Sequence, residues 1–163
     1  KSQNFGGSNS TRGFLGGGAT PTYQNVLEFF TIAQTGNGAD FGDLTDVAWG
    51  ACASNSPTRA VRYGGEGSGG SPGTVNVMYY WEMSSLGNAI DWGDVTAARQ
   101  SCSGSSSLTR GITCGGTTGT RVNTVDYHSM VSSGDSIDFG DLTATSTNPS
   151  VGSDGHGGLT LTS

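Results

Sequence analysis

The hexapeptide DFGDLT at residues 40–45 returns as DWGDVT at residues 91–96 and again as DFGDLT at residues 138–143. The copies are spaced 51 and 47 residues apart. Recurrence at a nearly fixed period of this length indicates a protein that is built from repeated structural units. The chain is therefore interpreted as three copies of one unit of roughly fifty residues.

Two further motifs occur once in each unit, in the same order and at matching distances. The first reads TRGFLGGG from Thr11, TRAVRYGG from Thr58 and TRGITCGG from Thr109. The second reads NVLEFFTI from Asn25, NVMYYWEM from Asn76 and NTVDYHSM from Asn123. Three motifs that recur together exclude a chance match and extend the repeat over most of the chain.

Each unit is predicted to contain about four short strands, because apolar and aromatic runs alternate with Gly, Ser, Thr and Asn turns. Residues two apart on a strand face the same side, so the positions of Leu27 and Phe29 are expected to face a core. No window shows sustained helical periodicity. The predicted fold class is all-β, with three four-stranded antiparallel repeats arranged as propeller blades or a partial propeller. The alternative is a threefold β-prism or a trefoil-like fold.

The chain is expected to form a single domain. Its three repeats cover residues of about 1–47, 48–98 and 99–145, and an extra strand segment covers 146–163. By the spacing of the motifs, residues 157–163 would be a degenerate fourth copy of the Arg-Gly strand.

Composition and charge limit the classes of partner. The 163 residues include 29 glycines, 33% hydrophobic residues and only 12% charged residues, and the net charge is −6. The apolar residues are grouped into β-type runs, which favours a folded protein over a disordered one. The cations are scattered, so neither nucleic acid nor an anionic membrane surface is an expected partner. No apolar run is long enough for a spanning helix.

The wording of the unit resembles kelch-type β-propeller repeats, in which a glycine doublet follows an apolar strand and aromatic positions follow the loop. More narrowly, TRGFLGGG, NVLEFFTIAQTGNGADFGDLT and the AAR at residues 97–99 resemble motifs of kelch-like arrays in marine bacteriophage structural proteins. The resemblance covers nearly the whole chain and implies propeller blades in virion surface, tail or tail-fibre proteins. It carries no catalytic residue. Three units are fewer than the four to eight blades that close a propeller.

The expected function is that of a non-enzymatic structural component of a virion appendage or an extracellular filament. The expected location is accordingly the virion or the extracellular space. Its partners would be copies of itself or other virion or filament subunits. The alternative is a carbohydrate- or receptor-binding module, adhesin-like or lectin-like, with surface glycans as ligands. No catalytic residues and no organic cofactor are expected.

Six aspartates recur in the acidic motif, which suggests a structural device, because a catalytic pair would occur once. Each Asp would accept backbone N–H bonds and fix a turn, so replacement of Asp43, Asp94 or Asp141 by Asn would cost roughly 1–3 kcal/mol. As an alternative, Asp43, Asp94 and Asp141 could bind Ca²⁺, which prefers carboxylate oxygens. The six are Asp40, Asp43, Asp91, Asp94, Asp138 and Asp141.

One arginine also recurs in each unit, as Arg12, Arg59 and Arg110. Because the guanidinium fork suits bidentate contact, each is predicted to bind a carboxylate of the acidic motif or backbone carbonyls. Binding of a sugar or an anion is the alternative.

The three cysteines leave at least one thiol without a partner in the chain. Buried free thiols are the expected state of the cysteines, and a disulfide between Cys102 and Cys114 across neighbouring strands is the alternative. His128 takes the position of Phe30 and Trp81, which favours a packed or surface ring over a catalytic base.

Three blades on an arc leave two open flanks, and soluble proteins avoid exposed apolar faces and unpaired strand edges. The chain is therefore not expected to work as a lone monomer. Two copies could close a six-bladed ring, or copies could join end to end with residues 146–163 supplying a strand to the neighbour. A compact monomer remains the expectation for the prism alternative.

Overall fold

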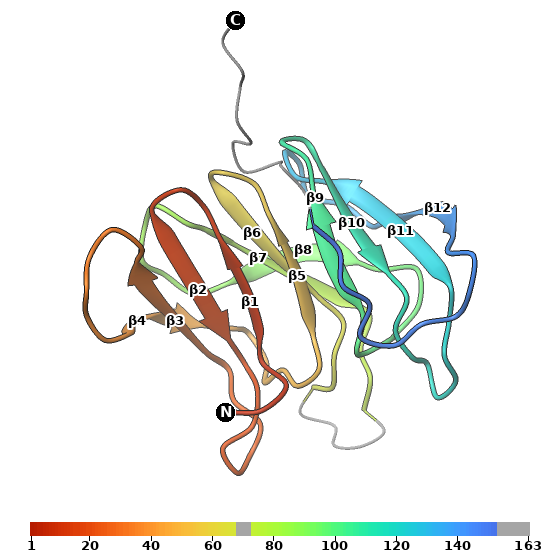
Figure 1. Ribbon diagram of the computed structural model, residues 1–163, viewed down its shortest axis with the longest axis horizontal. Coiled ribbons are helices and arrows are strands. Elements are labelled where there is room, and N and C mark those ends of the chain that lie inside the picture. The colour runs from red at the N-terminus through yellow and green to blue at the C-terminus, as the bar shows by residue number, and fades with distance from the viewer. Residues whose placement is uncertain (68–72, 153–163) are drawn as a thin grey trace, which may run out of the picture.

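The computed structural model describes residues 1–67 and 73–152, and these residues form strands and turns without a helix. Twelve strands in this part of the chain make three antiparallel sheets in which consecutive strands pair (Figure 1). The first sheet holds β1 (Phe5–Ser8), β2 (Arg12–Gly16), β3 (Val26–Thr31) and β4 (Ala39–Asp43). The second holds β5 (Cys52–Asn55), β6 (Arg59–Tyr63), β7 (Val77–Glu82) and β8 (Ile90–Asp94). The third holds β9 (Ser103–Ser106), β10 (Arg110–Cys114), β11 (Thr124–Ser129) and β12 (Ile137–Asp141).

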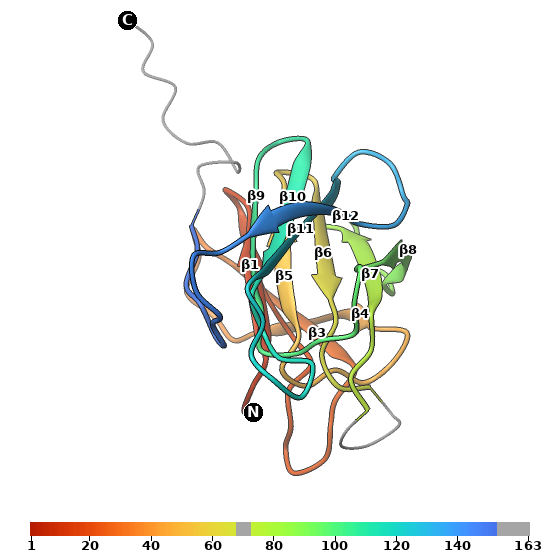
Figure 2. The same ribbon diagram turned by 90° about the vertical axis from the view of Figure 1, so that its right-hand side faces the viewer.

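The three sheets lie side by side like the blades of a propeller (Figures 1 and 2). Their first strands are the innermost ones: β1 contacts β5, and β5 contacts β9 and β10. The fourth strands, β4, β8 and β12, lie at the outer edges of their sheets. The predicted all-β fold with three four-stranded antiparallel repeats is confirmed, and the array is open, as in a partial propeller. Within the described ranges, no helix is long and apolar enough to span a bilayer.

A β-bulge between the third and fourth strands recurs in every sheet. In the first sheet the register shifts between Leu27 and Glu28, so that Phe41 is the extra residue on β4. The next residue, Gly42, has a φ of +146°, which side chains strongly disfavour. The same shift occurs opposite Gly93 and Gly140, with φ values of +137° and +136°. The glycine of the acidic motif is therefore a requirement of the bulge.

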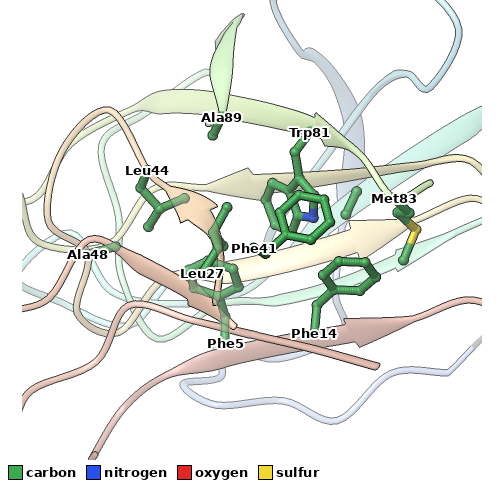
Figure 3. Packing of buried hydrophobic residues seen from close by; sticks show 10 residues of the cluster. Phe5, Phe14, Leu27, Phe41, Leu44, Ala48, Trp81, Met83 and Ala89 are labelled. Atoms are coloured by element: carbon green, nitrogen blue, oxygen red, sulfur yellow. The ribbon is translucent and has the colours of Figure 1, made fainter. Parts of the chain in front are cut away.

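The hydrophobic core lies between the sheets and forms two clusters, one at each junction. Figure 3 shows the first cluster, in which aromatic rings from the first sheet meet Trp81 of the second. The position of Leu27, Met78 and Val125 is buried in all three sheets, as predicted. The next position on that face, that of Phe29, is only half-buried. The second cluster consists of Cys52, Val61, Tyr63, Met78, Trp92, Val95, Cys102 and Met130.

A chain of backbone hydrogen bonds joins the start of each unit to the next. The Gly50 amide donates to the Gln3 carbonyl at 3.0 Å, and the Ser101 amide donates to the Gly50 carbonyl at 2.7 Å. The Asn148 amide continues the series to the Ser101 carbonyl at 2.7 Å. All four residues have a φ between +51° and +63°. The residues after β12 thus enter the path of a further unit, whereas the strand expected at residues 157–163 lies outside the described residues.

Candidate functional site

The residues that recur in every repeat meet at the junctions between neighbouring sheets. At the first junction the turn between β7 and β8 lies against the outer edge of β4. The Gly87 amide donates to the Phe41 carbonyl at 3.0 Å, and the Ala89 amide donates to the Asp43 carbonyl at 2.8 Å. The side-chain oxygen of Asn88 accepts a bond from the Asp43 amide at 3.0 Å. The turn of one sheet thereby covers the free edge of the preceding sheet.

The second junction repeats these bonds between the second and third sheets. The Gly134 amide donates to the Trp92 carbonyl at 2.8 Å, and the Ser136 amide donates to the Asp94 carbonyl at 2.7 Å. The Asp135 carboxylate accepts a hydrogen bond from the Asp94 amide at 3.0 Å. The side-chain oxygen of Asn88 accepts the equivalent bond at the first junction. The two junctions therefore use one contact pattern, despite different side chains at the turn.

The glycine of the acidic motif also provides clearance at these junctions. A Cβ on Gly42 would lie 2.4 Å from the Gly87 carbonyl oxygen, and a Cβ on Gly93 would lie 2.5 Å from the Gly134 carbonyl oxygen. Both distances are far below a normal contact with backbone. At Gly140, in the third sheet, a Cβ would meet nothing within 4 Å among the described residues.

Two of the three repeated arginines bind backbone carbonyls of the next sheet. Arg12 Nη1 donates to the Met83 carbonyl at 2.8 Å, and Arg59 Nη1 donates to the Val131 carbonyl at 2.7 Å. Arg59 also pairs with Glu82 of its own sheet at 2.6 Å. Of the two predicted partners, the carbonyls are thus correct and the carboxylates of the acidic motif are wrong, because the guanidinium projects across the junction. Arg110 has no such carbonyl in the described residues.

An aromatic position on the third strand fills each junction. Trp81 packs against Phe14 of the first sheet, with ring centroids 6.2 Å apart. His128 takes the same position in the third sheet and packs edge-on against Tyr63, with centroids 5.0 Å apart. Both side chains are buried, so of the packed and surface rings that were expected at His128, the packed one is correct. Burial lowers the pKa of His128 to about 4.

The glycine of the Arg-Gly motif lies beneath this aromatic position. A Cβ on Gly111 would lie 2.2 Å from the His128 ring, and one on Gly13 would lie 2.2 Å from the Phe30 ring. In the second unit Ala60 holds this position opposite Trp81, so the packed ring requires a small residue there and a glycine only beneath Phe30 and His128.

The aspartates of the acidic motif act through their backbone. Asp43 and Asp141 have exposed side chains, and that of Asp94 is half-exposed. Only Asp138 accepts a turn bond within the motif in the described residues, from the Gly140 amide at 3.3 Å. Asp40 and Asp91 are exposed. The prediction of buried, charge-assisted bonds is therefore wrong at residues 43, 94 and 141, because each strand presents its amide and carbonyl to the junction.

The proposed Ca²⁺ ligands do not come together. Asp43, Asp94 and Asp141 end three different sheets. In residues 1–67 and 73–152, no group of three or more His, Cys, Asp and Glu residues is placed to hold a metal ion.

The disulfide joins Cys52 to Cys102, so the expectation of free thiols is wrong for these two residues, and so is the alternative Cys102–Cys114 pair. The cross-strand neighbour of Cys114 is Ser103, whose side chain points to the opposite face from that of Cys102. Cys102 therefore faces β5 of the adjacent sheet, and the disulfide links the second sheet covalently to the third. Cys114 is a buried free thiol, and burial raises its pKa.

A buried ion pair was not found from the sequence. Arg99 and Asp126 are 1% and 0% exposed and lie 2.7 Å apart, and Thr96 Oγ1 donates to the same carboxylate at 2.8 Å. In the first unit Lys1 and Glu28 take these positions and form a partly exposed pair at 2.7 Å. Opposite charges at matching positions of two units were the signal in the sequence.

Glu66 connects loops of all three units. The Tyr23 hydroxyl donates to one carboxylate oxygen at 2.6 Å, and Gln100 donates to the other at 3.0 Å. The bond to Glu66 is the main cause of the raised pKa of Tyr23. Tyr23 also stacks on Trp49, with ring centroids 5.8 Å apart. Both carboxylate oxygens of Glu66 therefore accept bonds from neighbouring units, and this residue joins the three units.

A shallow polar cleft lies along the innermost strands. Its volume is about 230 Å³. Ser106 Oγ donates to the Asn55 carbonyl at 2.7 Å, and the Asn55 side chain donates to the Ser8 carbonyl, so part of the polar lining holds the inner strands together. The lining is formed by Gly7, Ser8, Ser54, Asn55, Gly104, Ser105, Ser106, Val151 and Gly152. Hydroxyl and amide groups of this kind can bind a small neutral polar molecule.

The two ends of the array carry the halves of the junction that no other sheet of the described residues covers. At one end the side chains of Phe30 and Ile32 are 48% and 52% exposed, whereas Trp81 and Met83 at the same positions are buried. At the other end Phe139 is 52% exposed, whereas Phe41 is 3% exposed. The two ends therefore expose the apolar positions that are buried at the inner junctions.

Comparison with protein-family models and with curated protein sequences gives no match to this chain.

Proposed function

We propose that the chain is a non-enzymatic structural component of a virion appendage or an extracellular filament, built from kelch-like repeats. The observation that carries the proposal is the use of the repeated residues. The acidic motif, the Gly-Asn/Asp turn and the arginine join sheet to sheet twice within the chain. Residues at the same repeat positions are also present at both ends of the array, which suits a subunit that binds a neighbouring subunit end to end.

The Cys52–Cys102 disulfide supports the location in the proposal. Structural disulfides form and persist in oxidising environments, which include the extracellular space and the surface of virions. Linking the second and third sheets also suits a component that must keep its shape outside the cell.

Particle association tests the proposal. Native particles or filaments are purified by density gradient, washed with high salt, and probed by mass spectrometry and by immunogold labelling against the folded chain. The expected result is a constant ratio of this chain to the main particle protein and labelling along an appendage. Recovery of the native protein only as a free species, with no particle-bound fraction, would contradict the proposal.

A carbohydrate-binding role is the second candidate, favoured by the polar cleft along the inner strands. The cleft is smaller than a typical ligand pocket of about 300–1,000 Å³, so it suits a single sugar ring. A glycan array with the wild-type chain tests this role. Ser105→Leu, which fills the cleft, should abolish any specific signal, while Leu108→Ser outside the cleft should keep it. An array without specific binding would exclude this candidate.

A further inference from the structure

We propose that the chain binds a second copy of itself end to end, with the turn at residues 36–38 of one copy docked on residues 139–141 of the other. The inference rests on the proposed function and names the partner and the contact within it. Its basis is continuity: the chain already forms this contact twice between its own sheets.

The hydrogen-bonding groups for a third junction are present. Gly36, Asn37 and Gly38 correspond by repeat position to the turns at 87–89 and 134–136. In the described part of the chain, the Gly36 and Gly38 amides donate to no backbone acceptor. Their acceptors in a second copy would be the carbonyls of Phe139 and Asp141, by analogy with Phe41 and Asp43. The bulge conformation is already set, since Gly140 has the same φ as its counterparts and open space beside it.

The apolar surfaces of the two ends match in the same way. Phe30 and Ile32 hold the positions of Trp81 and Met83, which are buried against the preceding sheet. On the other end the exposed Phe139 and the half-buried Ile112 hold the positions of Phe41 and Phe14. Docking would bring these two surfaces together and bury both.

Arg110 supplies the directional contact. Its guanidinium lies 4.8 Å from the centroid of the Tyr127 ring, just as that of Arg12 lies 4.9 Å from the Phe29 ring. Arg12 in that position donates to the Met83 carbonyl. In a second copy the matching acceptor is the carbonyl of Ile32, so Arg110 is oriented for a partner that residues 1–67 and 73–152 do not supply.

The contact is heterologous, because each copy uses a different end. Such a contact closes into a ring or continues into an open filament, depending on the rotation between copies. Val151 and Gly152 lie three and four residues after Asn148, where the inner strand of a further unit would begin. In the proposed contact, β1 of the second copy would occupy the position of this inner strand. A chain that ends at Pro149 is therefore expected to associate at least as strongly as the full chain.

Sedimentation velocity over a range of concentrations tests the association. The full chain is expected to shift from monomer to larger species as its concentration rises, and Ile32→Asp should shift the midpoint at least tenfold upward. Ile90→Asp is the matched control, because Ile90 is similarly exposed but lies on the middle sheet. Circular dichroism confirms that both variants are folded. A monomer at all concentrations, equal effects of the two variants, or loss of association in the chain that ends at Pro149 would overturn the proposal.

Cross-linking tests which surfaces meet. Asn37→Cys and Asp141→Cys variants are treated with a short bis-maleimide, separately and as a mixture. Cross-linked dimers are expected in the mixture and not in either variant alone, because the two ends bind each other. Equal dimer yields from a single variant would overturn the end-to-end geometry. Absence of self-association in a chain that is nevertheless found in native particles would reject this inference alone and leave the proposed function with a different neighbouring subunit.

Discussion

The junctions inside the chain and its two ends are built from the same repeated residues but differ in what surrounds them. At the inner junctions, Trp81 and Phe41 are buried between sheets, and Arg59 donates to a carbonyl across the gap. At the ends, Phe30 and Phe139 are about half exposed, and the Arg110 guanidinium lies over rings of its own sheet. Burial at these positions therefore depends on the presence of a neighbouring sheet more than on the residue type.

The comparison also applies to charge. Arg99 and Asp126 are fully buried at an inner junction, whereas Lys1 and Glu28 form the equivalent pair at an end and remain partly exposed. A buried pair depends on both partners, because removal of one leaves an uncompensated charge, whereas an exposed pair contributes little. Mutations at matching positions can thus separate the effect of the junction from the effect of the residue.

The largest expected difference is between Trp81 and Phe30. Trp81→Ala should lower the free energy of unfolding by about 3–5 kcal/mol, because it leaves a cavity in the first cluster, whereas Phe30→Ala should cost less than about 1 kcal/mol. Guanidinium denaturation at a low protein concentration, where copies are separate, measures both. Equal losses at the two positions would contradict the comparison.

The two ion pairs should differ by a somewhat smaller amount. Asp126→Ala should cost about 3 kcal/mol, since it leaves Arg99 buried with only the weak contact to the Thr113 carbonyl. Glu28→Ala should cost at most about 1 kcal/mol, because water and salt screen its pair with Lys1. Both are measured by denaturation at low and high salt, and only the second should become smaller at high salt.

His128 gives a junction that depends on pH. Burial lowers its pKa to about 4 from 6.5, so the unfolded chain takes up a proton at higher pH than the folded chain does. Neutral His128 therefore costs the folded state no stability above pH 6.5. The free energy of unfolding then decreases as the pH drops from 6.5 to 4. Over this range the loss from His128 should be roughly 2–3 kcal/mol.

His128→Phe should remove this part of the pH dependence, because phenylalanine is the residue at the equivalent position 30 and does not titrate. Thermal unfolding of the wild-type chain and the variant between pH 4 and pH 8 measures the difference. Identical slopes in the two proteins would show that His128 is not the titrating group.

Gly93 and Gly140 separate the clearance of the junction from the cost of the bulge. Both have the same φ, so alanine introduces similar backbone strain at either position. Only at Gly93 would the new Cβ also meet a backbone oxygen of the next sheet. Gly93→Ala should therefore cost about 1–2 kcal/mol more than Gly140→Ala in the dilute chain. Equal losses of stability in the two variants would mean that the turn at Gly134 moves away from the new Cβ without a cost in free energy.

The smallest effect is expected at the aspartates themselves. Asp43→Asn and Asp94→Asn should change the free energy of unfolding by less than about 0.5 kcal/mol, because the junction uses their backbone groups and leaves their carboxylates in contact with solvent. Chemical denaturation at neutral pH is the measurement. A loss of more than about 1 kcal/mol would restore the role that the sequence suggested for these carboxylates.

The sequence was sufficient to predict the sheets because each is a meander of neighbouring segments, and their periodicity is local. The partners across the junctions were harder to predict. Arg12 and the Met83 carbonyl are 71 residues apart, and no residue type marks a carbonyl as an acceptor. The acidic motif was predicted to act through its carboxylates because side chains are what a sequence displays. Its glycine and its backbone make the contact.

The Cys52–Cys102 disulfide was not predicted from the sequence for a related reason. Cys102 and Cys114 are close in the sequence and lie on adjacent segments, which suggested a pair. The register places Ser103 opposite Cys114, and a shift of one residue reverses the face of a side chain. The positions of Cys52 and Cys102 became neighbours only when two sheets packed together, which motif spacing alone does not specify.

Amide hydrogen exchange at Gly38 tests the central claim that one contact joins sheets within the chain and between copies. Its counterparts Ala89 and Ser136 donate to carbonyls across the inner junctions and should be protected at every concentration. The account predicts that the Gly38 amide exchanges rapidly in the dilute chain and becomes at least tenfold slower at concentrations where larger species form. Fast exchange at Gly38 in fully associated protein, or equal exchange at all three amides in the monomer, would contradict it.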